Sequence, residues 1–83
     1  MNISRGALVQ ITAGKYKGLV MAVIKLDGAY IYVSDGRHRK LERLKQYNPK
    51  HVKALDVRIV EKELDALANK ALWRKIQQMS VDI

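Results

Sequence analysis

Residues 6–18 read GALVQITAGKYKG, and the fold can be worked out from this stretch outward. Apolar side chains recur at every second position from Ala7 to Ile11, which is the period of a half-buried β-strand. The glycines at 14 and 18 enclose Lys-Tyr-Lys and predict a tight loop. The next run, Leu19 to Leu26, is apolar on both faces until Lys25 and predicts a second strand covered on both sides.

Turn signals extend the pattern in the C-terminal direction. Asp27-Gly28 and Asp35-Gly36 tolerate the positive φ of tight turns, so strands two, three and four are expected to be sequential hairpins. The third strand is the alternating segment from Ala29 to Val33. Asn48-Pro49 predicts a loop or a single 3-10 turn, and Leu55 to Ile59 alternates again as a late closing strand.

The hydrophobic period changes near residue 60 and becomes helical. One face of the expected helix carries Leu64, Leu67, Ala68, Ala71 and Leu72. Acidic residues lead this segment and basic residues follow, as the helix dipole favours. The sequence therefore predicts a mainly β domain at residues 1–60 and a C-terminal amphipathic α-helix at residues 61–83 that packs on it.

The expected docking face of this helix is the outward side of strands two and three. There it would cover Leu19, Met21 and Val23 and also Tyr30 and Tyr32. The two tyrosines leave a second interpretation open, in which they stack on bases of a nucleic acid. Burial of the leucines of the helix gives the packing interpretation its energetic basis.

Charge is the most informative bulk property. The chain has 16 Lys and Arg against 8 Asp and Glu, a net charge of +8. Residues 1–60 hold twelve of these bases and four acids, whereas residues 61–83 are neutral. A polyanionic partner is therefore expected at the strands and loops. A neutral helix argues against a membrane surface, because a membrane-binding helix carries its own positive charge.

Length and composition argue against several other classes of protein. Eighty-three residues suffice for one domain with a modest core, and without cysteine neither a disulfide framework nor a thiolate metal site can form. No secretory pattern opens the sequence, and the longest apolar run, Leu19 to Ile24, is too short to span a bilayer. A cytoplasmic protein without a cofactor is expected.

Lys15, Tyr16 and Lys17 form the first candidate RNA site. Two ammonium groups beside an aromatic ring suit a loop that pairs phosphates and stacks on a base. The flanking glycines also have a purely structural interpretation, since a tight loop requires their conformational freedom.

The second candidate RNA site is the basic segment after the third strand, which contains Arg37, His38, Arg39, Lys40, Arg43, Lys45, Lys50 and Lys53. Strand-like alternation would place Arg37, Arg39 and Arg43 on one face, with basic residues on the other face too. An arginine fork holds a phosphate in two hydrogen bonds, which favours nucleic acid over mere solubility. The two histidines, without cysteines, make a poor metal site, so no metal is expected.

Trp73 and Ile76 fall away from the stripe of Leu64 and form a separate patch on the second half of the helix. An exposed Trp is a plausible anchor for a protein partner. Distortion of the helix or a frayed end explains the same pattern.

Catalysis is not expected. Ser34, Asp35 and His38 are close in sequence, but such a combination is common in turns and catalytic triads usually draw on separate elements. The loop from Gly14 to Gly18 lacks the Walker pattern and leads into a strand. No catalytic residue is assigned.

The stretch from Gly6 to Gly18, with the apolar strand ending at Val23-Ile24, resembles a KOW motif. Together with the following hairpin and basic segment, residues 5–60 are similar to the archaeal and eukaryotic large-subunit ribosomal protein family called fourteen e and to its short bacterial KOW relatives. Many KOW motifs have a glycine at the position of Met21. Its replacement by methionine argues against membership of the transcription-elongation branch more than against the barrel fold.

The resemblance implies an SH3-like small β-barrel that contacts RNA through its first loop and basic edges. The expected function is thus a non-catalytic, ribosome- or translation-associated RNA-binding protein, with ribosomal RNA as its partner and a second, protein partner at the helix. A protein-interaction module or a transcription-elongation KOW module is the alternative.

Overall fold

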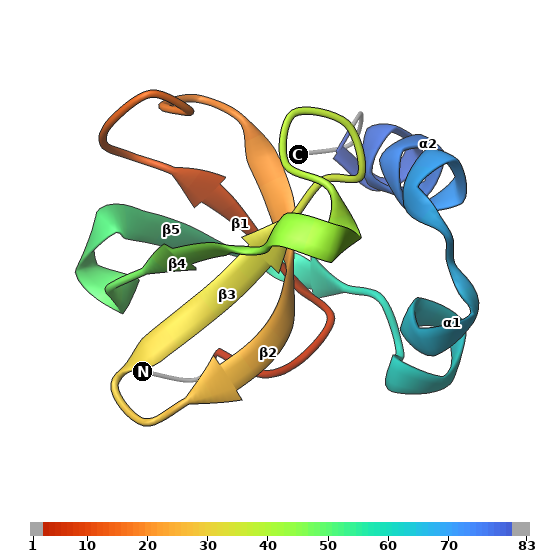
Figure 1. The fold of residues 1–83 in the computed structure, drawn as a ribbon, viewed down its shortest axis with the longest axis horizontal. Coiled ribbons are helices and arrows are strands. Elements are labelled where there is room, and N and C mark those ends of the chain that lie inside the picture. Colours follow the sequence, from red (N-terminus) through yellow and green to blue (C-terminus); the bar gives the residue numbers. More distant parts are fainter. Residues whose placement is uncertain (1–2, 81–83) are drawn as a thin grey trace.

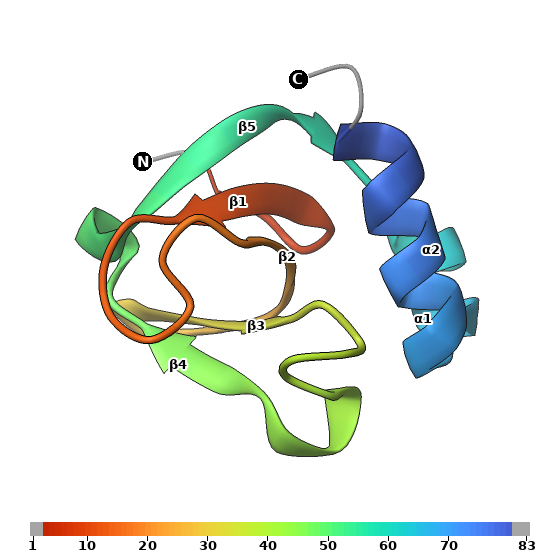
Figure 2. The ribbon, with the colours of Figure 1, turned by 90° about the horizontal axis from the view of Figure 1, so that it is seen from above.

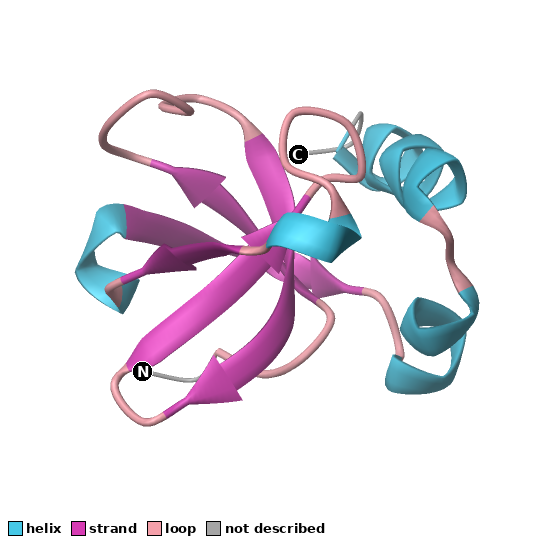
Figure 3. Ribbon diagram, viewed as in Figure 1, coloured by secondary structure: helices cyan, strands magenta, loops and turns pink. Residues whose placement is uncertain are grey.

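The computed structural model describes residues 3–80, which form one antiparallel sheet followed by two helices (Figure 1; Figure 3). The strand order is β4-β3-β2-β1-β5, and the strands are β1 (Ala7–Ile11), β2 (Val20–Asp27), β3 (Tyr30–Ser34), β4 (Lys45–Tyr47) and β5 (Val52–Arg58). The helices are α1 (Glu61–Ala66) and α2 (Asn69–Ser80), and the 3-10 turns are η1 (Leu41–Arg43) and η2 (Pro49–His51). A mainly β domain with a C-terminal helical part is confirmed. Seen from above, the sheet is strongly curved (Figure 2), yet no pairing joins β4 to β5 in residues 3–80.

Several local predictions are confirmed. A two-residue turn, Gly28-Ala29, joins β2 to β3, and Asp27 pairs with Tyr30 across it. The residues after Asn48 form the predicted 3-10 turn, because the Asn48 side chain accepts a hydrogen bond from the Lys50 amide. The last strand, β5, begins three residues earlier than predicted and pairs antiparallel with β1 without closing the sheet within the described residues, and the β-to-α boundary falls at Ile59-Val60.

The core consists of two clusters on the two faces of the sheet. Alternate side chains of a strand point to opposite faces, so the first cluster takes Ala7, Val9, Ile11, Met21, Val23, Ile31, Val33, Tyr47 and Val52. The second cluster lies under the helices and takes Leu8, Ala22, Ile59, Leu64, Leu72 and Ile76. Both faces of β1 and of the first half of β2 are therefore buried.

The predicted docking face of the helix was wrong. Met21 and Val23 are fully buried in the first cluster and Leu19 packs against it, whereas the helices cover Leu8 and Ala22. The sequence of β2 is apolar on both faces, so it does not indicate which face the helix takes.

The helices also leave both tyrosines of β3 uncovered, contrary to prediction. Tyr30 is 43% exposed, and the ammonium nitrogen of Lys25 lies 5.4 Å from the centre of the half-buried Tyr32 ring.

The single helix predicted after residue 60 is divided at Leu67 and Ala68. Leu67 is extended, with φ −89° and ψ 126°. Eleven residues are about three turns, so in one continuous helix Lys75 would lie on the face of the buried Leu64. The break lets Leu64, Leu72 and Ile76 reach the second cluster while Lys75 pairs with Glu63 at 3.1 Å. Neither helix in the described chain is long and apolar enough to cross a membrane.

Arg5 fastens α1 to the sheet. Its Nε donates to the Ile24 carbonyl at 2.7 Å, and its guanidinium donates to the Asp65 carboxylate at 2.7 Å. The hydrogen bond to Asp65 raises the pKa of Arg5 above its ordinary value. The Arg5 side chain thus links Ile24 of β2 to Asp65 of α1.

Candidate nucleic-acid interface

The basic segment predicted as a strand is instead a loop, residues 35–44, that folds around the Asp35 carboxylate. This side chain is fully buried, and its Oδ1 accepts hydrogen bonds from the amides of Arg37 at 2.9 Å and Arg39 at 3.0 Å. Its Oδ2 lies 2.8 Å from Nδ1 of His38. A buried carboxylate is costly without such donors, so the loop holds its conformation around this charge. The predicted placement of Arg37, Arg39 and Arg43 on one face of a strand, with His38 and Lys40 on the other, was therefore wrong. The tight hairpin turn predicted at Asp35-Gly36 was wrong too, because β4 begins only at Lys45.

Ser34 closes the same loop from the end of β3. Its hydroxyl donates to the Arg39 carbonyl at 2.6 Å and accepts from the Gly36 amide at 3.0 Å. Ser34 and Asp35 are both fully buried. Except for the contact of Asp35 Oδ2 with the His38 ring, their polar side-chain atoms bond to the backbone of the loop, and the basic side chains of Arg37 and Lys40 are left exposed.

The loop docks on the beginning of α2 through Asn69. The Asn69 side-chain oxygen accepts from the Leu41 amide at 2.8 Å, and its nitrogen donates to the Glu42 carboxylate at 2.6 Å. Gly36, at φ +77°, lies so close that a Cβ there would overlap the Asn69 carbonyl oxygen. The loop and the helix therefore form one unit although they are far apart in the sequence.

Trp73 completes this contact. The guanidinium carbon of Arg37 lies 5.1 Å from the centre of an indole ring of Trp73, and the His38 ring meets Trp73 edge-on at 5.5 Å. An open recess of about 390 Å³, which we call the Trp73 recess, lies beside this stack and is lined by Gly36, Arg37, Lys40, Asn69, Lys70 and Trp73.

Lys70 was missed by the sequence reasoning. The neutral total of residues 61–83 concealed it, because three of the four acids in this segment belong to α1 (Glu61, Glu63 and Asp65), whereas α2 carries only bases among its charged residues (Lys70, Arg74 and Lys75). The break between the helices thus gives α2 a positive charge next to the basic loop. Separate charge counts on either side of a helix break are the signal that would have found Lys70.

The first predicted RNA site joins the second. The Tyr16 hydroxyl donates to the His38 carbonyl at 3.3 Å, and the Tyr16 ring packs against the first core cluster. Lys15 and Lys17 are exposed, and the Lys15 ammonium lies 5.6 Å from the centre of the Tyr16 ring. Tyr16 is half-buried, so it positions the two loops and offers only part of its ring to a ligand.

Three other predicted residues lie farther from the Trp73 recess. Lys45 is on the edge strand β4, with its ammonium 5.8 Å from the centre of the Tyr47 ring. Lys50 is exposed in η2, at the opposite end of the sheet from α2 (Figure 1; Figure 2). Lys53 is exposed on β5 beside Gln10. These lysines extend the basic surface but do not line the recess.

Tyr47 and the backbone of Arg43 support the basic surface from below and from the side of the loop. Burial raises the pKa of the Tyr47 phenol, and the neighbouring Tyr16 phenol raises it further. The Arg39 Nε donates to the Arg43 carbonyl at 2.6 Å, so Arg39 helps to hold the loop while Arg43 remains exposed.

The predicted partner patch of Trp73 with Ile76 was wrong. Ile76 is fully buried in the second core cluster, and Trp73 is half-buried against Arg37 and His38. Both residues belong to α2, and the break lets α2 turn Ile76 into the second core cluster. Trp73 consequently belongs to the basic surface.

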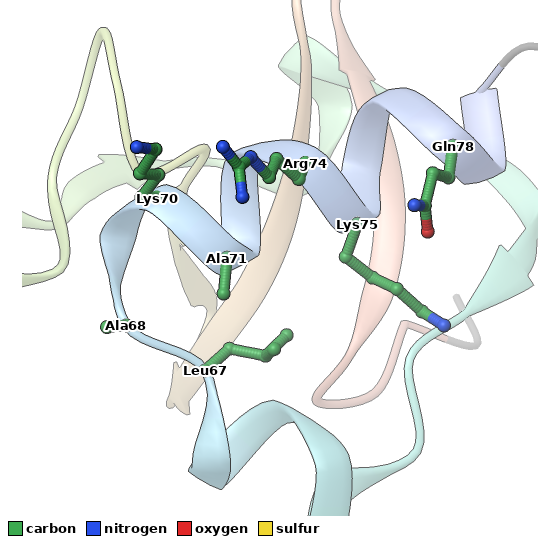
Figure 4. A pocket seen from close by; sticks show the side chains of 7 residues that line it. All are labelled: Leu67, Ala68, Lys70, Ala71, Arg74, Lys75 and Gln78. Carbon is green, nitrogen blue, oxygen red and sulfur yellow. The ribbon is translucent and has the colours of Figure 1, made fainter.

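A separate groove of about 380 Å³ runs along α2 from the link between the helices, on the other side of Lys70, and is lined by residues of this link and of α2. Figure 4 shows Leu67 and Ala71 beside this space, with basic side chains around them. Arg74 is exposed at the rim, and Lys75 is engaged by Glu63. This groove combines apolar side chains with basic residues at its edge.

No protein-family model matches this sequence, and a comparison with curated proteins gives no match.

Proposed function

We propose that this protein is a non-catalytic RNA-binding protein that holds structured RNA on its basic loops. The observation that carries the proposal is the convergence of Arg37, Lys40 and Lys70 around Trp73, joined through Tyr16 to the lysines of the first loop. Cations with interleaved aromatic rings suit phosphates and unstacked bases.

The charged side chains on this surface are suited to phosphate contacts. Six exposed cations flank the joined loops: Lys15, Lys17, Arg37, Lys40, Arg43 and Lys70. Five to six phosphate contacts correspond to a slope of about −4 to −5 in log K against log salt. Binding with this dependence is electrostatic and uses few base-reading groups.

The proposal includes an SH3-like small barrel of KOW type. It is supported by the meander of β1 to β4, by β5 next to β1, and by the resemblance of residues 5–60. In this proposal the barrel is open between β4 and β5. Met21, which departs from the glycine of many KOW motifs, is a fully buried core residue, and the ribosomal branch is the one we favour.

Ribosomal RNA of the large subunit or of its assembly intermediates is the proposed partner. A small surface with few base-reading groups gains selectivity by fitting a large, prefolded RNA. Sedimentation of a lysate through sucrose gradients tests this. We expect co-migration with ribosomal particles at low salt and partial or complete release at high salt, whereas copurification with RNA polymerase would refute the ribosomal assignment.

Binding of RNA itself is tested by charge reversal. We expect the double variant Arg37→Glu/Lys40→Glu to lose affinity for a structured RNA while its circular dichroism is unchanged. The matched control, Arg58→Glu/Lys62→Glu, makes the same change of charge at exposed positions on β5 and α1. If both variants lost RNA affinity equally, the loss would be an effect of net charge, and the basic loop would not be the binding site.

The groove along α2 favours a second candidate function, protein interaction. Its apolar side chain Leu67 and its exposed bases Lys70 and Arg74 suit an acidic segment that carries an apolar residue. Leu67→Glu is expected to abolish capture of such a segment and to leave RNA affinity unchanged. If Leu67→Glu lowers RNA affinity as strongly as Arg37→Glu, the groove belongs to the RNA surface.

A further inference from the structure

The Trp73 recess has a stacked wall. Trp73 is half-buried, the Arg37 guanidinium lies over its ring, and the His38 imidazole meets it edge-on. A guanidinium is planar and stacks on flat groups with either face. The wall therefore presents a planar cation, already positioned by an indole, to whatever enters the recess.

From this stack we infer that the Trp73 recess takes one unpaired nucleotide of the bound RNA, with its base stacked on the Arg37–Trp73 pair. The inference deepens the proposed RNA binding and rests on it. A base inside a duplex is covered by its neighbours, so only a bulged, looped or terminal nucleotide can offer its face.

Size and charge agree with this occupant. The volume of about 390 Å³ is within the range of about 300–1,000 Å³ typical of small-ligand sites. Exposed Lys40 and Lys70 stand at the rim, from the loop and from α2 respectively. They are placed to pair with the phosphates on either side of an extruded nucleotide, while Trp73 and Arg37 take the base.

The recess is not equipped to read the edge of the base. The Asn69 side chain is engaged by Leu41 and Glu42, and the Gly36 amide donates to the Ser34 hydroxyl. These groups hold the loop on the helix. Recognition by stacking tolerates every base, so the recess distinguishes unpaired from paired nucleotides and has only a weak preference among the four bases.

The test compares two hairpin RNAs that share one stem sequence and one GNRA tetraloop, whose bases stack on one another; the stem of the first is fully paired, and the stem of the second contains one additional, bulged uridine. Affinities are measured with the full chain by anisotropy of the labelled RNA, and the emission of Trp73, the sole tryptophan, reports on the recess directly. We expect tighter binding of the bulged hairpin by about 5- to 150-fold, the range that stacking of one base provides, with quenching of Trp73. A bulged adenosine should behave similarly.

Two variants assign the preference to the recess. Trp73→Leu keeps apolar packing but removes the ring, and Arg37→Lys keeps the charge but removes the planar group. Each is expected to reduce the preference to less than about 3-fold while affinity for the paired hairpin is retained, since phosphate contacts supply that affinity. The control Lys62→Ala, on the exposed face of α1, is expected to keep the preference.

Each contrary outcome has a distinct meaning. Equal affinity of the wild type for the two hairpins would overturn the inference and leave the proposed RNA binding intact. A preference that survives in Arg37→Lys, whose fold is verified by circular dichroism, would likewise overturn it. Failure of the wild type to bind either hairpin at low salt would refute the proposed function itself.

Discussion

The hydroxyl of Tyr16 donates a hydrogen bond to the carbonyl oxygen of His38 across 3.3 Å, and it thereby joins the loop after β1 to the loop after β3. The sequence separates these loops by an entire hairpin. Because of this bond the lysines beside Tyr16 and the arginines beside His38 belong to one surface.

Tyr16→Phe removes only this bond. A single partly exposed hydrogen bond contributes about 0.5–1.5 kcal/mol, so we expect a loss of that size in the free energy of unfolding by urea, with a small decrease in RNA affinity. Tyr30→Phe is the control, since it removes the same hydroxyl from an exposed side chain at the start of β3. Equal effects of the two substitutions would mean that the Tyr16 bond does not connect the loops in solution.

Lys40→Ala is expected to reduce the salt dependence of RNA binding. One phosphate contact contributes about 0.9 to the slope of log K against log salt for a duplex, and Lys40 is exposed at the rim of the Trp73 recess. Titrations at several salt concentrations measure the slope. The control Lys62→Ala should leave it unchanged, and a wild-type slope in Lys40→Ala would remove Lys40 from the contacts.

Gly36→Ala tests the docking of the basic loop on α2. Both Gly36 and Gly28 have positive φ, but a Cβ at Gly36 would overlap the Asn69 carbonyl, whereas at Gly28 it meets open space. Backbone strain alone costs about 1–3 kcal/mol. We therefore expect Gly28→Ala to lower the free energy of unfolding by that strain and Gly36→Ala to lower it further, with loss of RNA affinity only in the latter. If the two substitutions destabilised the protein equally, the loop would move away from the Asn69 carbonyl without a loss of free energy, and the docking contact would not contribute to stability.

The stability of the protein should decline in alkaline solution partly through Tyr47. Burial raises the pKa of the folded phenol above its ordinary value of 10.0. Above about pH 10 the unfolded chain loses this proton while the folded one retains it, so unfolding is favoured as pH rises. Melting curves of wild type and Tyr47→Phe should diverge only above this pH, with the wild type losing more. Parallel curves would assign the alkaline decline to other groups.

Truncation after Val60 is expected to lower the melting midpoint or cause aggregation, because it uncovers Leu8 and Ala22 of the second core cluster. Leu72→Ala, a milder change, should cost about 2–5 kcal/mol as a buried large-to-small substitution. Ala71→Ser on the exposed side of α2 is the control for Leu72. An unchanged melting midpoint after truncation would contradict the packing of α2 on β1 and β2.

The sequence predicted correctly those elements that neighbouring residues determine. The turn at Gly28, the 3-10 turn after Asn48 and the change of period near residue 60 all depend on neighbouring residues, and all are confirmed. The face of the sheet that receives the helices was mispredicted, because β2 is apolar on both sides and Met21 and Ala22 alternate between the two clusters.

The candidate site depends on contacts over long sequence distances. Asp35 was recognised only as part of a turn signal, yet its buried carboxylate organises the basic loop, and Asn69 fixes that loop from 28 residues beyond Leu41. The role of Lys70 follows from the break at Leu67, which tertiary packing of Leu64 and Leu72 favours. The arginines and lysines were visible in the sequence, whereas their arrangement around Trp73 was not.

The division of the helical segment at Leu67 also gives the molecule an electric polarity. Glu61 and Asp65 of α1 are held near Arg5, whereas Lys70 of α2 stands beside the basic loop. In the field of a polyanion such a charge distribution experiences a torque that turns the α2 side forward before contact. Orientation during approach raises the fraction of encounters that become complexes, so the break influences the association rate as well as the bound state.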